Sequence, residues 1–382
     1  MNRDSKILIS GAGVSGLACA LWLARAGFKP VVVEKAASIR AGGYLVSLSE
    51  GAYAFARELD LIDDLRQFDI GITASSYHDR SGASILDLDY GKMIGSNIDV
   101  IQMMRDDFVR VLYDRAKDMA DFRFGDAITD IDQTPDGADV TFSSGNEERF
   151  DVVIGCDGLH SAVRKASFHD ANITEHYLGL YCAAFRLPNV LGISDKFETH
   201  MERDRYMATF TTREGDLGAV FVWGGEGRKT PPRAERHDFL MRAFDGTTDA
   251  IQQVLAHCPK DNSFYMDALC QIEMPTWHNG SSVLVGDAAH CLTLFSGRGA
   301  AAAFAGAGRL SKALIEHDKQ AAFDAYEAET MPIISQIQPA TRDAVKWYVP
   351  RSNANYYLRD AVMRFVPNAV FRKYFRMKYS QV

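Results

Sequence analysis

The sequence has few features that would indicate a metal centre or a disulfide framework. Its six cysteines are scattered through 382 residues, without a C-x-x-C motif and without a histidine pair at metal-ligand spacing. Cysteines in this arrangement are typical of buried free thiols in a reducing cytosol. A Ser/His/Asp set of the kind that hydrolases use is also lacking. We therefore predict no metal site, and the sequence names no catalytic residue.

The chain also lacks an excess of basic charge and a long apolar run without glycine. It carries 42 Lys and Arg against 50 Asp and Glu, a net charge of −8, so no general field attracts it to nucleic acid. The uncharged stretch 7–24 is interrupted by Gly11, Gly13 and Gly16, which argues against a signal peptide or a membrane span. We predict a cytoplasmic protein, a monomer or weak dimer, with no nucleic-acid partner and no stable membrane association.

Length and apolar pattern indicate two structural regions. The chain exceeds the roughly 100–200 residues of a typical domain, and 47% of its residues are hydrophobic. Short apolar runs of the kind that parallel sheets bury on both faces occur at Ile7–Ile9, Val31–Val33, Val152–Ile154 and Val283–Val285. Because the first and the last run are far apart in the chain, a domain that contains all four must be discontinuous.

The first run leads into a glycine motif, Gly11-Ala-Gly13-Val14-Ser15-Gly16. A strand, this motif and a helix together predict a dinucleotide site: Gly11 permits the turn, Gly13 lets backbone approach a pyrophosphate, and Gly16 lets helix and strand close. The second strand ends at Glu34, whose carboxylate can accept hydrogen bonds from both ribose hydroxyls. The motif does not distinguish NAD from FAD.

Two further segments end a predicted parallel strand with an aspartate. Asp157-Gly158 follows the run at 152–154, and Gly286-Asp287 follows the run at 283–285. Open α/β sheets bind their ligands at this edge. With these three motifs in this order, the sequence closely resembles the class A flavoprotein monooxygenases, the aromatic-hydroxylase family, over most of its length up to about residue 315.

The resemblance implies a non-covalently bound FAD. It implies that Asp287 contacts the ribityl chain or nearby groups, that Arg105 holds the phosphate or ribityl region, and that the Asp157-Gly158 loop serves both FAD and a transient nicotinamide. The motifs and the resemblance together predict a set of FAD-binding residues: Gly11, Gly13, Val14, Ser15, Gly16, Glu34, Lys35, Arg40, Gly43, Arg105, Asp157, Gly158, Asp287, Gly297, Gly299 and Ala300. His290, beside Asp287, is expected to pack structurally rather than to act as a base.

The segment 296–299, Ser-Gly-Arg-Gly, is expected to open a small-residue helix whose N-terminus can stabilise negative charge on a reduced flavin. The family usually has proline shortly before this segment, where this chain has Thr293 and Leu294. The segments 34–43 and 178–189 resemble most closely the branch of this family that contains the tetracycline-inactivating monooxygenases. Where those enzymes carry Asp-x-Arg, this chain has Ser47-Leu48-Ser49, which weakens a tetracycline assignment.

The predicted architecture is α/β, a discontinuous Rossmann-like FAD-binding domain with an inserted sheet-and-helix substrate domain and a C-terminal helical tail. The boundaries are 1–167 and 275–345 for the FAD-binding domain, 168–274 for the substrate domain and 346–382 for the tail. The tail is basic and aromatic, and Pro367 is expected to split it into two helices. We expect these helices to pack over the junction of the two domains, with Arg359, Arg364 and Arg372 in solvent.

The resemblance implies a monooxygenase that uses NADPH or NADH and O2 to hydroxylate a phenolic, polycyclic or polyketide-like small molecule through a flavin C4a-hydroperoxide. A second glycine motif for a separate nicotinamide domain is lacking, as expected for a transient reductant. Two alternatives remain open: an FAD-dependent reductase or dehydrogenase on the same scaffold, and a tetracycline-inactivating enzyme as the specific substrate variant. A non-catalytic flavin-binding or membrane-associated protein is the third class. A flavin halogenase is disfavoured because its W-x-W-x-I-P segment is absent.

Overall fold

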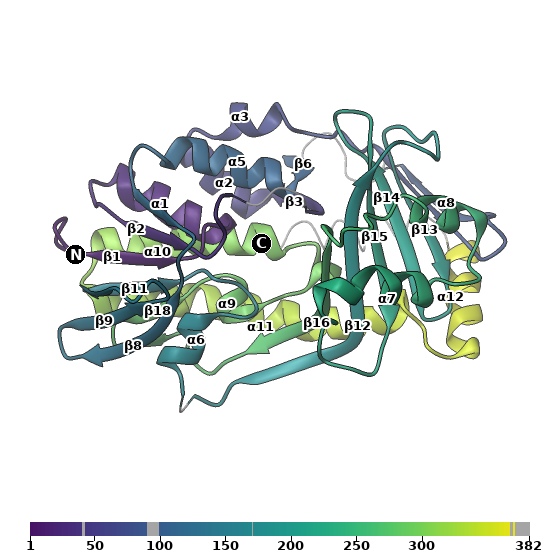
Figure 1. The fold of residues 1–382 in the computed structure, drawn as a ribbon. Helices are drawn as coiled ribbons and strands as arrows, with labels where there is room; N and C mark the ends of the chain where they lie inside the picture. Colours follow the sequence, from purple (N-terminus) through teal and green to yellow (C-terminus); the bar gives the residue numbers. More distant parts are fainter. Residues whose placement is uncertain (40–42, 90–98, 170, 367–369, 371–382) are drawn as a thin grey trace.

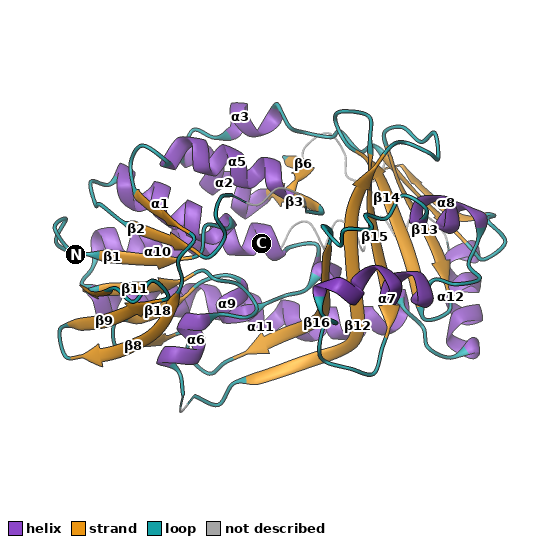
Figure 2. Cartoon of the chain, in the orientation of Figure 1, coloured by secondary structure: helices purple, strands orange, loops and turns teal. Residues whose placement is uncertain are grey.

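The computed structural model describes residues 1–39, 43–89, 99–169, 171–366 and 370. Two large sheets organise the chain and lie at opposite ends of the molecule (Figure 1). The sheet near the N-terminus has six strands, and the other has seven. Helices cover the six-stranded sheet, and the mixed α/β composition that the sequence predicts is confirmed (Figure 2).

The six-stranded sheet contains all four apolar runs of the sequence. Its order is β17-β18-β11-β1-β2-β7, and every pairing except β17 with β18 is parallel. The strands are β1 (Ile7–Ser10), β2 (Val31–Glu34), β7 (Asp121–Phe124), β11 (Val152–Gly155), β17 (His278–Asn279) and β18 (Ser282–Leu284). Strands β1 and β11 are fully buried, as expected for strands covered on both faces. Because β18 pairs with β11, the late part of the chain returns to the sheet that the N-terminus begins.

Helices and two small sheets surround this sheet. Helix α1 packs against α10 and α5, and α10 also packs against α11. The helices of this region are α1 (Val14–Arg25), α2 (Glu50–Glu58), α3 (Ile62–Arg66), α5 (Arg105–Ala116), α6 (Ala162–Ser167), α9 (Asp287–His290), η2 (Leu294–Ser296), α10 (Gly299–Glu316) and α11 (Lys319–Tyr348). The small sheets are β3 (Leu45–Ser49) with β6 (Val100–Met104), and β8 (Ile128–Thr134) with β9 (Gly137–Phe142) and β10 (Glu147–Phe150).

The seven-stranded sheet has the order β16-β12-β15-β14-β13-β4-β5. Its strands are β4 (Ala74–His78), β5 (Ser84–Asp89), β12 (Thr174–Leu187), β13 (Lys196–Glu202), β14 (Arg205–Thr211), β15 (Leu217–Gly224) and β16 (Tyr265–Glu273), and the segments beside it are η1 (Arg233–Glu235), α7 (Arg236–Ala243) and α8 (Asp249–Leu255). Alternate residues face opposite sides: Tyr181 and Phe221 pack under α7 and α8, whereas Cys182 and Val222 face Phe295 and the end of α11.

The sheet extends beyond the substrate domain that the sequence predicts. Strands β4 and β5 come from 74–89, inside the range 1–167 assigned to the FAD-binding domain. Strand β4 pairs in parallel with β13 from Lys196↔Ala74 to His200↔His78. This pairing satisfies the backbone groups of β13, which would otherwise be a sheet edge. A boundary drawn along the chain therefore misses the first part of this sheet.

The C-terminal segment differs from the prediction in position and in burial. The boundary at 345/346 cuts through α11, and α12 (Asn353–Phe365) lies at the far end of the seven-stranded sheet, not over the junction (Figure 1). Arg359 is fully buried and pairs with Asp360, so the expectation of a solvated side chain was wrong. Arg364 is half exposed and pairs with Asp79 at 2.7 Å, and both Pro367 and Arg372 lie outside the described residues.

Two proline residues lie inside α11, at Pro332 and Pro339, without ending it. Among the helices that the structure describes, none combines the length and the apolar composition needed to cross a membrane.

Candidate cofactor site

The glycine turn after β1 is required by the packing of the protein itself. Gly11 has φ +101°, and a Cβ atom there would lie 2.6 Å from the carbonyl oxygen of Cys156. A Cβ atom on Gly16 would lie 1.9 Å from the carbonyl oxygen of Gly11. Because real Cβ atoms do not approach backbone this closely, both positions need glycine before any ligand is considered.

The N-terminus of α1 is arranged to bind an anion. Gly13 caps the helix without a side-chain hydrogen bond, and the first turn carries no acid. For a Cβ atom on Gly13, the nearest atom is Nη2 of Arg105 at 3.8 Å. Free backbone N–H groups, the helix dipole and a guanidinium therefore meet at one place, and this combination binds phosphate groups. Val14 and Ser15 form the first turn and are buried.

Glu34 ends β2 and holds the loops on both sides of it. Its Oε2 accepts a hydrogen bond from the backbone N–H of Ala12 at 2.9 Å, and its Oε1 accepts one from Ala36 at 2.9 Å. A carboxylate oxygen can accept more than one hydrogen bond, and ribose hydroxyls are donors of the kind it accepts. The side chain of Lys35, next in the chain, is exposed.

Asp157 supports the loop after β11. Its Oδ2 accepts hydrogen bonds from the backbone N–H groups of Ala162 (2.7 Å) and Val163 (3.2 Å), and from the Ser10 hydroxyl (3.3 Å). These contacts cap α6 and join β11 to β1. Gly158 follows with φ +78°. The structure therefore gives Asp157 a positioning role within this loop.

Arg164 connects the same loop to the Asp287 segment. It is buried, its Nη1 donates to the carbonyl oxygen of Ala288 at 2.7 Å, and its Nη2 donates to that of Leu159. Two motifs more than 120 positions apart in the sequence are thus fixed to each other by one guanidinium.

Arg105, Tyr44 and Asp287 lie within electrostatic reach of one another. Burial raises the pKa of the Tyr44 hydroxyl, with the Arg105 charge opposing this and Asp287 adding to it. Burial also raises the pKa of Asp287, and Arg105 opposes that shift. The backbone N–H of Arg105 donates to the carbonyl oxygen of Tyr44 at 3.0 Å, and a Cβ atom on Gly43 would lie 3.1 Å from Cβ of Arg105. The site thus places one cation and one anion together in a poorly hydrated setting.

The N-terminal part of α10 lies at the carboxyl edge of the six-stranded sheet, near Gly286. Gly286 has φ +66°, and a Cβ atom there would lie 3.1 Å from Cβ of Ala303 and 3.2 Å from Oγ of Ser15. Gly286 therefore packs against the first turn of α1 and the second turn of α10. Before α10, Thr293 has φ +65°, uncommon for a β-branched residue.

The remaining predicted residues fall into two groups. Gly297 (φ +63°), Gly299 and Ala300 lead into the first turn of α10, where Arg298 caps without a side-chain hydrogen bond. Arg40 lies outside the described residues. The described members of the predicted set other than Lys35 are thus gathered along the carboxyl edge of the six-stranded sheet and at the helix N-termini beside it.

His290 points into the interior instead. It is 2% exposed, its ring lies 4.9 Å from the Trp277 ring, and burial lowers its pKa to about 4. Its Nε2 has no hydrogen-bond partner among the described residues. It therefore packs structurally.

Aromatic residues that the sequence analysis missed gather near Cys182. Tyr44, Tyr206 and Tyr265 lie within electrostatic reach of its thiol, and Tyr44 lies within reach of Arg105 and Asp287 as well. The Tyr44 and Tyr265 rings are 5.8 Å apart, and the Tyr206 and Phe295 rings are 6.2 Å apart. Tyr265 is 42% exposed, yet burial raises its pKa well above the usual value. The Tyr265 side chain therefore packs among other residues while part of it faces water. No motif marks these residues; only the position of Tyr44 beside the paired glycines could have drawn attention to it.

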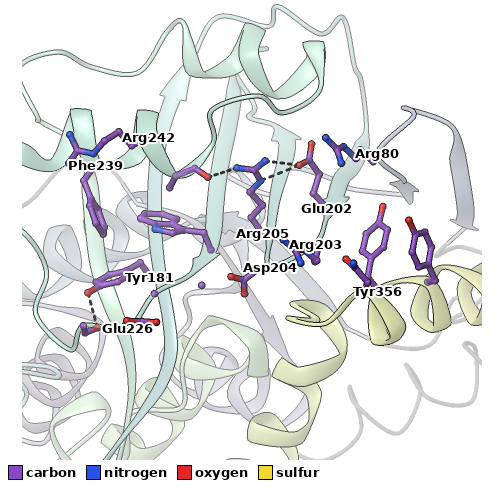
Figure 3. Close-up of a pocket in the computed structure, with 17 residues that line it drawn as sticks. Arg80, Tyr181, Glu202, Arg203, Asp204, Arg205, Glu226, Phe239, Arg242 and Tyr356 are labelled. Carbon is purple, nitrogen blue, oxygen red and sulfur yellow. Dashed lines mark hydrogen bonds and ion pairs between the residues drawn. The ribbon is translucent and has the colours of Figure 1, made fainter.

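A cavity of about 930 Å³ lies elsewhere, where the seven-stranded sheet meets α7 and α12 (Figure 3). Its lining includes Arg205, Trp223 and Tyr356. Arg205 is held by Glu202 at 3.1 Å and by the carbonyl oxygen of Ala243 at 2.6 Å. None of the described residues predicted to bind FAD lines this cavity, so it is separate from the candidate cofactor site.

Comparison with known proteins agrees with this geometry. A family model described as an FAD binding domain matches residues 4–341. A flavin-dependent monooxygenase from Legionella longbeachae serogroup 1 (strain NSW150) is 33% identical over 312 residues, covering 80% of this chain and 79% of the relative.

Solved structures share the whole fold. Tetracycline destructase Tet(51) has a TM-score of 0.83 at 25% identity and covers 99% of both chains. HpxO of Klebsiella pneumoniae, solved with FAD and uric acid, has a TM-score of 0.83 at 21% identity, covering 98% of this chain and 96% of its own. The chain therefore belongs to the FAD-binding family of flavin-dependent monooxygenases.

Proposed function

We propose that this enzyme uses NADPH or NADH and O2 to hydroxylate a phenolic, polycyclic or polyketide-like small molecule. The observation that carries the proposal is the meeting of two features. One is the anion-binding edge on the six-stranded sheet, and the other is an aromatic wall, Tyr44, Tyr206, Tyr265 and Phe295, of which Tyr44 lies within reach of Arg105 and Asp287. FAD, when bound, supplies the redox chemistry, accepting reducing equivalents and activating O2. The residues of the chain bind the cofactor, orient the substrate and exclude water.

The residues along the edge fit FAD by the chemistry of their donors. The N-terminus of α1, with Gly11, Gly13 and Arg105, would hold the pyrophosphate, and Glu34 would accept from the ribose. Asp287 and the loop at Asp157-Gly158 would face the ribityl side. The N-terminus of α10, with Gly297, Gly299 and Ala300, would stabilise negative charge on a reduced ring. A covalent attachment residue is not indicated, so the cofactor is proposed to be non-covalent.

The tyrosines of the wall would orient the substrate as hydrogen-bond donors. Burial raises the pKa of Tyr44, Tyr206 and Tyr265, so their hydroxyls keep their protons at neutral pH and cannot act as general bases. A phenol or enol oxygen can accept from such a hydroxyl while its ring packs on the aromatic side chains. The Cys182 thiol nearby is also protonated, because burial raises its pKa to about 12.

The test begins with the purified protein. It should be yellow, and boiling should release the colour into the supernatant. A panel of phenolics and polyketides is then screened for stimulated NADPH and NADH oxidation, and a product from labelled O2 is analysed by mass spectrometry. One labelled oxygen atom in the product supports hydroxylation. Stimulated oxidation with an unlabelled, reduced product would identify the reductase alternative instead.

Tetracycline belongs in the panel as a second candidate substrate. The resemblance of the whole chain to Tet(51) favours it. Against it stands strand β3, where Ser47 and Ser49 replace the Asp-x-Arg pair of the tetracycline-inactivating branch. We therefore expect tetracycline to stimulate NAD(P)H oxidation less than the best phenolic substrate.

A further inference from the structure

Three potential metal ligands lie on one face of the seven-stranded sheet, away from the candidate cofactor site. Strand β4 ends at His78, and β13 contains Glu198 and His200. The parallel register places His200 directly opposite His78, and Glu198 lies two residues before His200 on the same face. One ligand atom from each side chain lies within 4.8 Å of the others. The sequence does not reveal this group, because His78 and His200 are far apart in the chain and meet only through the pairing of β4 with β13.

The group is largely buried, and three of its four ring nitrogens lack partners among the described residues. His200 is 7% exposed, and neither of its ring nitrogens has a hydrogen-bond partner among the described residues; the same holds for Nε2 of His78. Oε2 of Glu198 lies 3.9 Å from Nε2 of His78 and 4.0 Å from Nε2 of His200. Buried polar groups are normally satisfied, so unpaired nitrogens on two histidines beside a carboxylate indicate a missing ligand.

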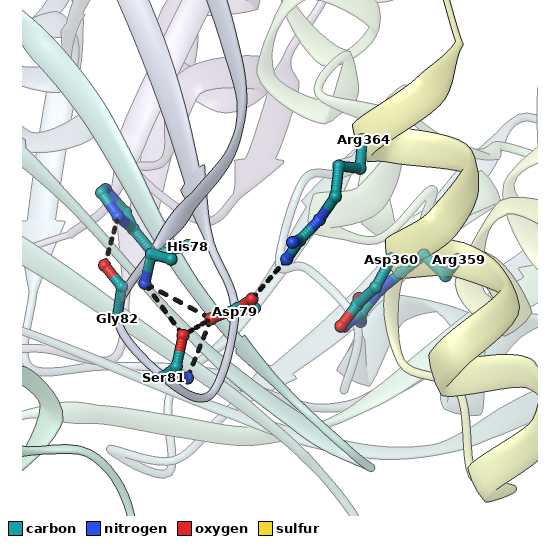
Figure 4. A network of polar contacts seen from close by, with 8 residues as sticks. His78, Asp79, Ser81, Gly82, Arg359, Asp360 and Arg364 are labelled. Atoms are coloured by element: carbon teal, nitrogen blue, oxygen red, sulfur yellow. Dashed lines mark hydrogen bonds and ion pairs between the residues drawn. The ribbon is translucent and has the colours of Figure 1, made fainter.

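The orientation of His78 fits the same conclusion. Its Nδ1 lies 3.3 Å from the carbonyl oxygen of Gly82, in the turn between β4 and β5 (Figure 4). A carbonyl can only accept, so the Nδ1 atom carries a proton. In the neutral ring Nε2 is then the unprotonated nitrogen, and it lies 3.9 Å from Oε2 of Glu198. Metal-binding histidines are commonly fixed through their other ring nitrogen in this way. The turn is itself braced, because Asp79 binds Ser81 and pairs with Arg364 of α12.

We propose that His78, Glu198 and His200 bind one divalent d-block cation, with Zn²⁺ as the preferred ion. Two imidazoles and a carboxylate form a donor set that suits zinc, and three protein ligands leave a position for water. Donors around a tetrahedral zinc at about 2.0–2.2 Å are roughly 3.3–3.6 Å apart, so ligand atoms that lie up to 4.8 Å apart must close by about 1.5 Å or less.

Binding also requires one ring to turn. The His78 and His200 rings are stacked, with centroids 4.8 Å apart and an interplanar angle of 15°. An imidazole lone pair lies in the plane of its ring, so two stacked rings cannot both point at one ion. Histidine χ2 is a soft torsion, and its rotation breaks the stack at small cost. A zinc-bound structure should therefore show these rings no longer parallel.

The consequence is a link between two distant parts of the chain. The ion would join the β4–β5 hairpin, which comes from the first part of the chain, to β13 of the inserted segment. An ion that binds the native state and not the unfolded chain raises the free energy of unfolding. The proposed role is structural and independent of the oxygenation reaction.

The test uses the FAD-loaded full-length protein, freed of metal with EDTA and titrated with ZnCl2 by calorimetry. One zinc per chain and a higher Tm are expected. His200→Asn and Glu198→Gln should weaken binding by more than the about 10- to 100-fold cost of losing an outer-shell partner, and should abolish the Tm shift. Both variants should keep their FAD, which shows that they are folded.

A matched control is His176→Asn. It removes another histidine–carboxylate pair of the same sheet, with Nε2 of His176 2.8 Å from Oε2 of Glu273, and zinc binding should be unchanged. Zinc-edge X-ray absorption should show nitrogen and oxygen ligands alone. The proposal is overturned if zinc does not bind, if His200→Asn binds it as tightly as the parent, or if sulfur ligands show that the cysteines hold it.

Discussion

The two large sheets of this protein differ in where the polar groups that meet in space lie in the sequence. The six-stranded sheet uses short buried strands, and its polar groups come directly after them in contiguous motifs, as in the turn from Gly11 to Gly16. The seven-stranded sheet uses longer strands, up to the 14 residues of β12, and its polar groups meet across strand pairs. His78 with His200 is an example. A local motif can be recognised in the sequence, whereas a cross-strand pair exists only once register is known.

Substitution of Gly16 should have the largest effect of all, because it disturbs the packing of α1 beside the six-stranded sheet. Gly16→Ala places a Cβ atom 1.9 Å from the Gly11 carbonyl oxygen, so α1 and β1 must move apart. We expect no bound FAD and a loss of about 3 kcal/mol or more in the free energy of unfolding, at the upper end of overpacking effects. Flavin absorbance per chain and urea unfolding of the FAD-free protein measure the two effects separately.

Gly13→Ala provides the control for that experiment. Its Cβ atom would meet Nη2 of Arg105 at 3.8 Å, an ordinary contact. The FAD-free variant should therefore unfold within about 1 kcal/mol of the parent, yet lose FAD, because the pyrophosphate needs the space. Retention of FAD by Gly13→Ala would show that the pyrophosphate does not approach this glycine.

Asp287→Ala and Arg105→Ala should have the next largest effect, which is weaker FAD binding. A lost charged hydrogen-bond partner costs about 1.5–3 kcal/mol, roughly tenfold to a hundredfold in affinity. Fluorescence titration of the FAD-free variants with FAD measures this. Asp114→Asn changes an exposed acid of α5 that pairs with Lys117 and should leave the affinity unchanged. If His290→Ala lost FAD more readily than either variant, the assignment of these two residues would be wrong.

The free energy of unfolding should depend on pH in a way that reflects the burial of His290. Burial lowers its pKa from 6.5 to about 4, so below pH 6.5 the unfolded state binds a proton that the folded state does not. The free energy of unfolding therefore falls as the pH falls, by about 2 kcal/mol between pH 7 and pH 5 from this group. His290→Asn should remove that share in urea titrations at both values. An unchanged pH dependence in the variant would mean that another group is responsible.

The smallest effect is expected at the far end of the seven-stranded sheet, where α12 lies. Arg364→Gln breaks the ion pair with Asp79, but half of the Arg364 side chain is in solvent, where such pairs contribute about 1 kcal/mol or less. FAD content and substrate-stimulated NAD(P)H oxidation should be unchanged, because α12 lies away from the candidate cofactor site. Loss of turnover in this variant would favour the original prediction that the tail packs over the junction of the two domains.

The sequence was more informative about positions than about roles. Asp157 was predicted correctly to lie at the sheet edge, but its carboxylate caps α6. Glu34 likewise bonds the backbone of Ala12 and Ala36. In both cases the residue type and the spacing are those of a ligand-binding motif, and the hydrogen bonds depend on how close the neighbouring loops come. The tail was misplaced because amphipathicity shows that a helix must pack, without showing on which surface.

The sequence alone determined the parallel sheet, its glycine turn and the FAD family. These follow from residues adjacent in the chain, where buried runs, φ > 0 turns and helix starts are set by local sterics and hydrogen bonding. The tertiary structure alone decided that β4 and β5 complete the second sheet, that Tyr44 meets Tyr265, that Arg359 is buried and that His78 faces His200. These contacts join segments far apart in the chain, and their energy depends on register and packing that no local pattern specifies.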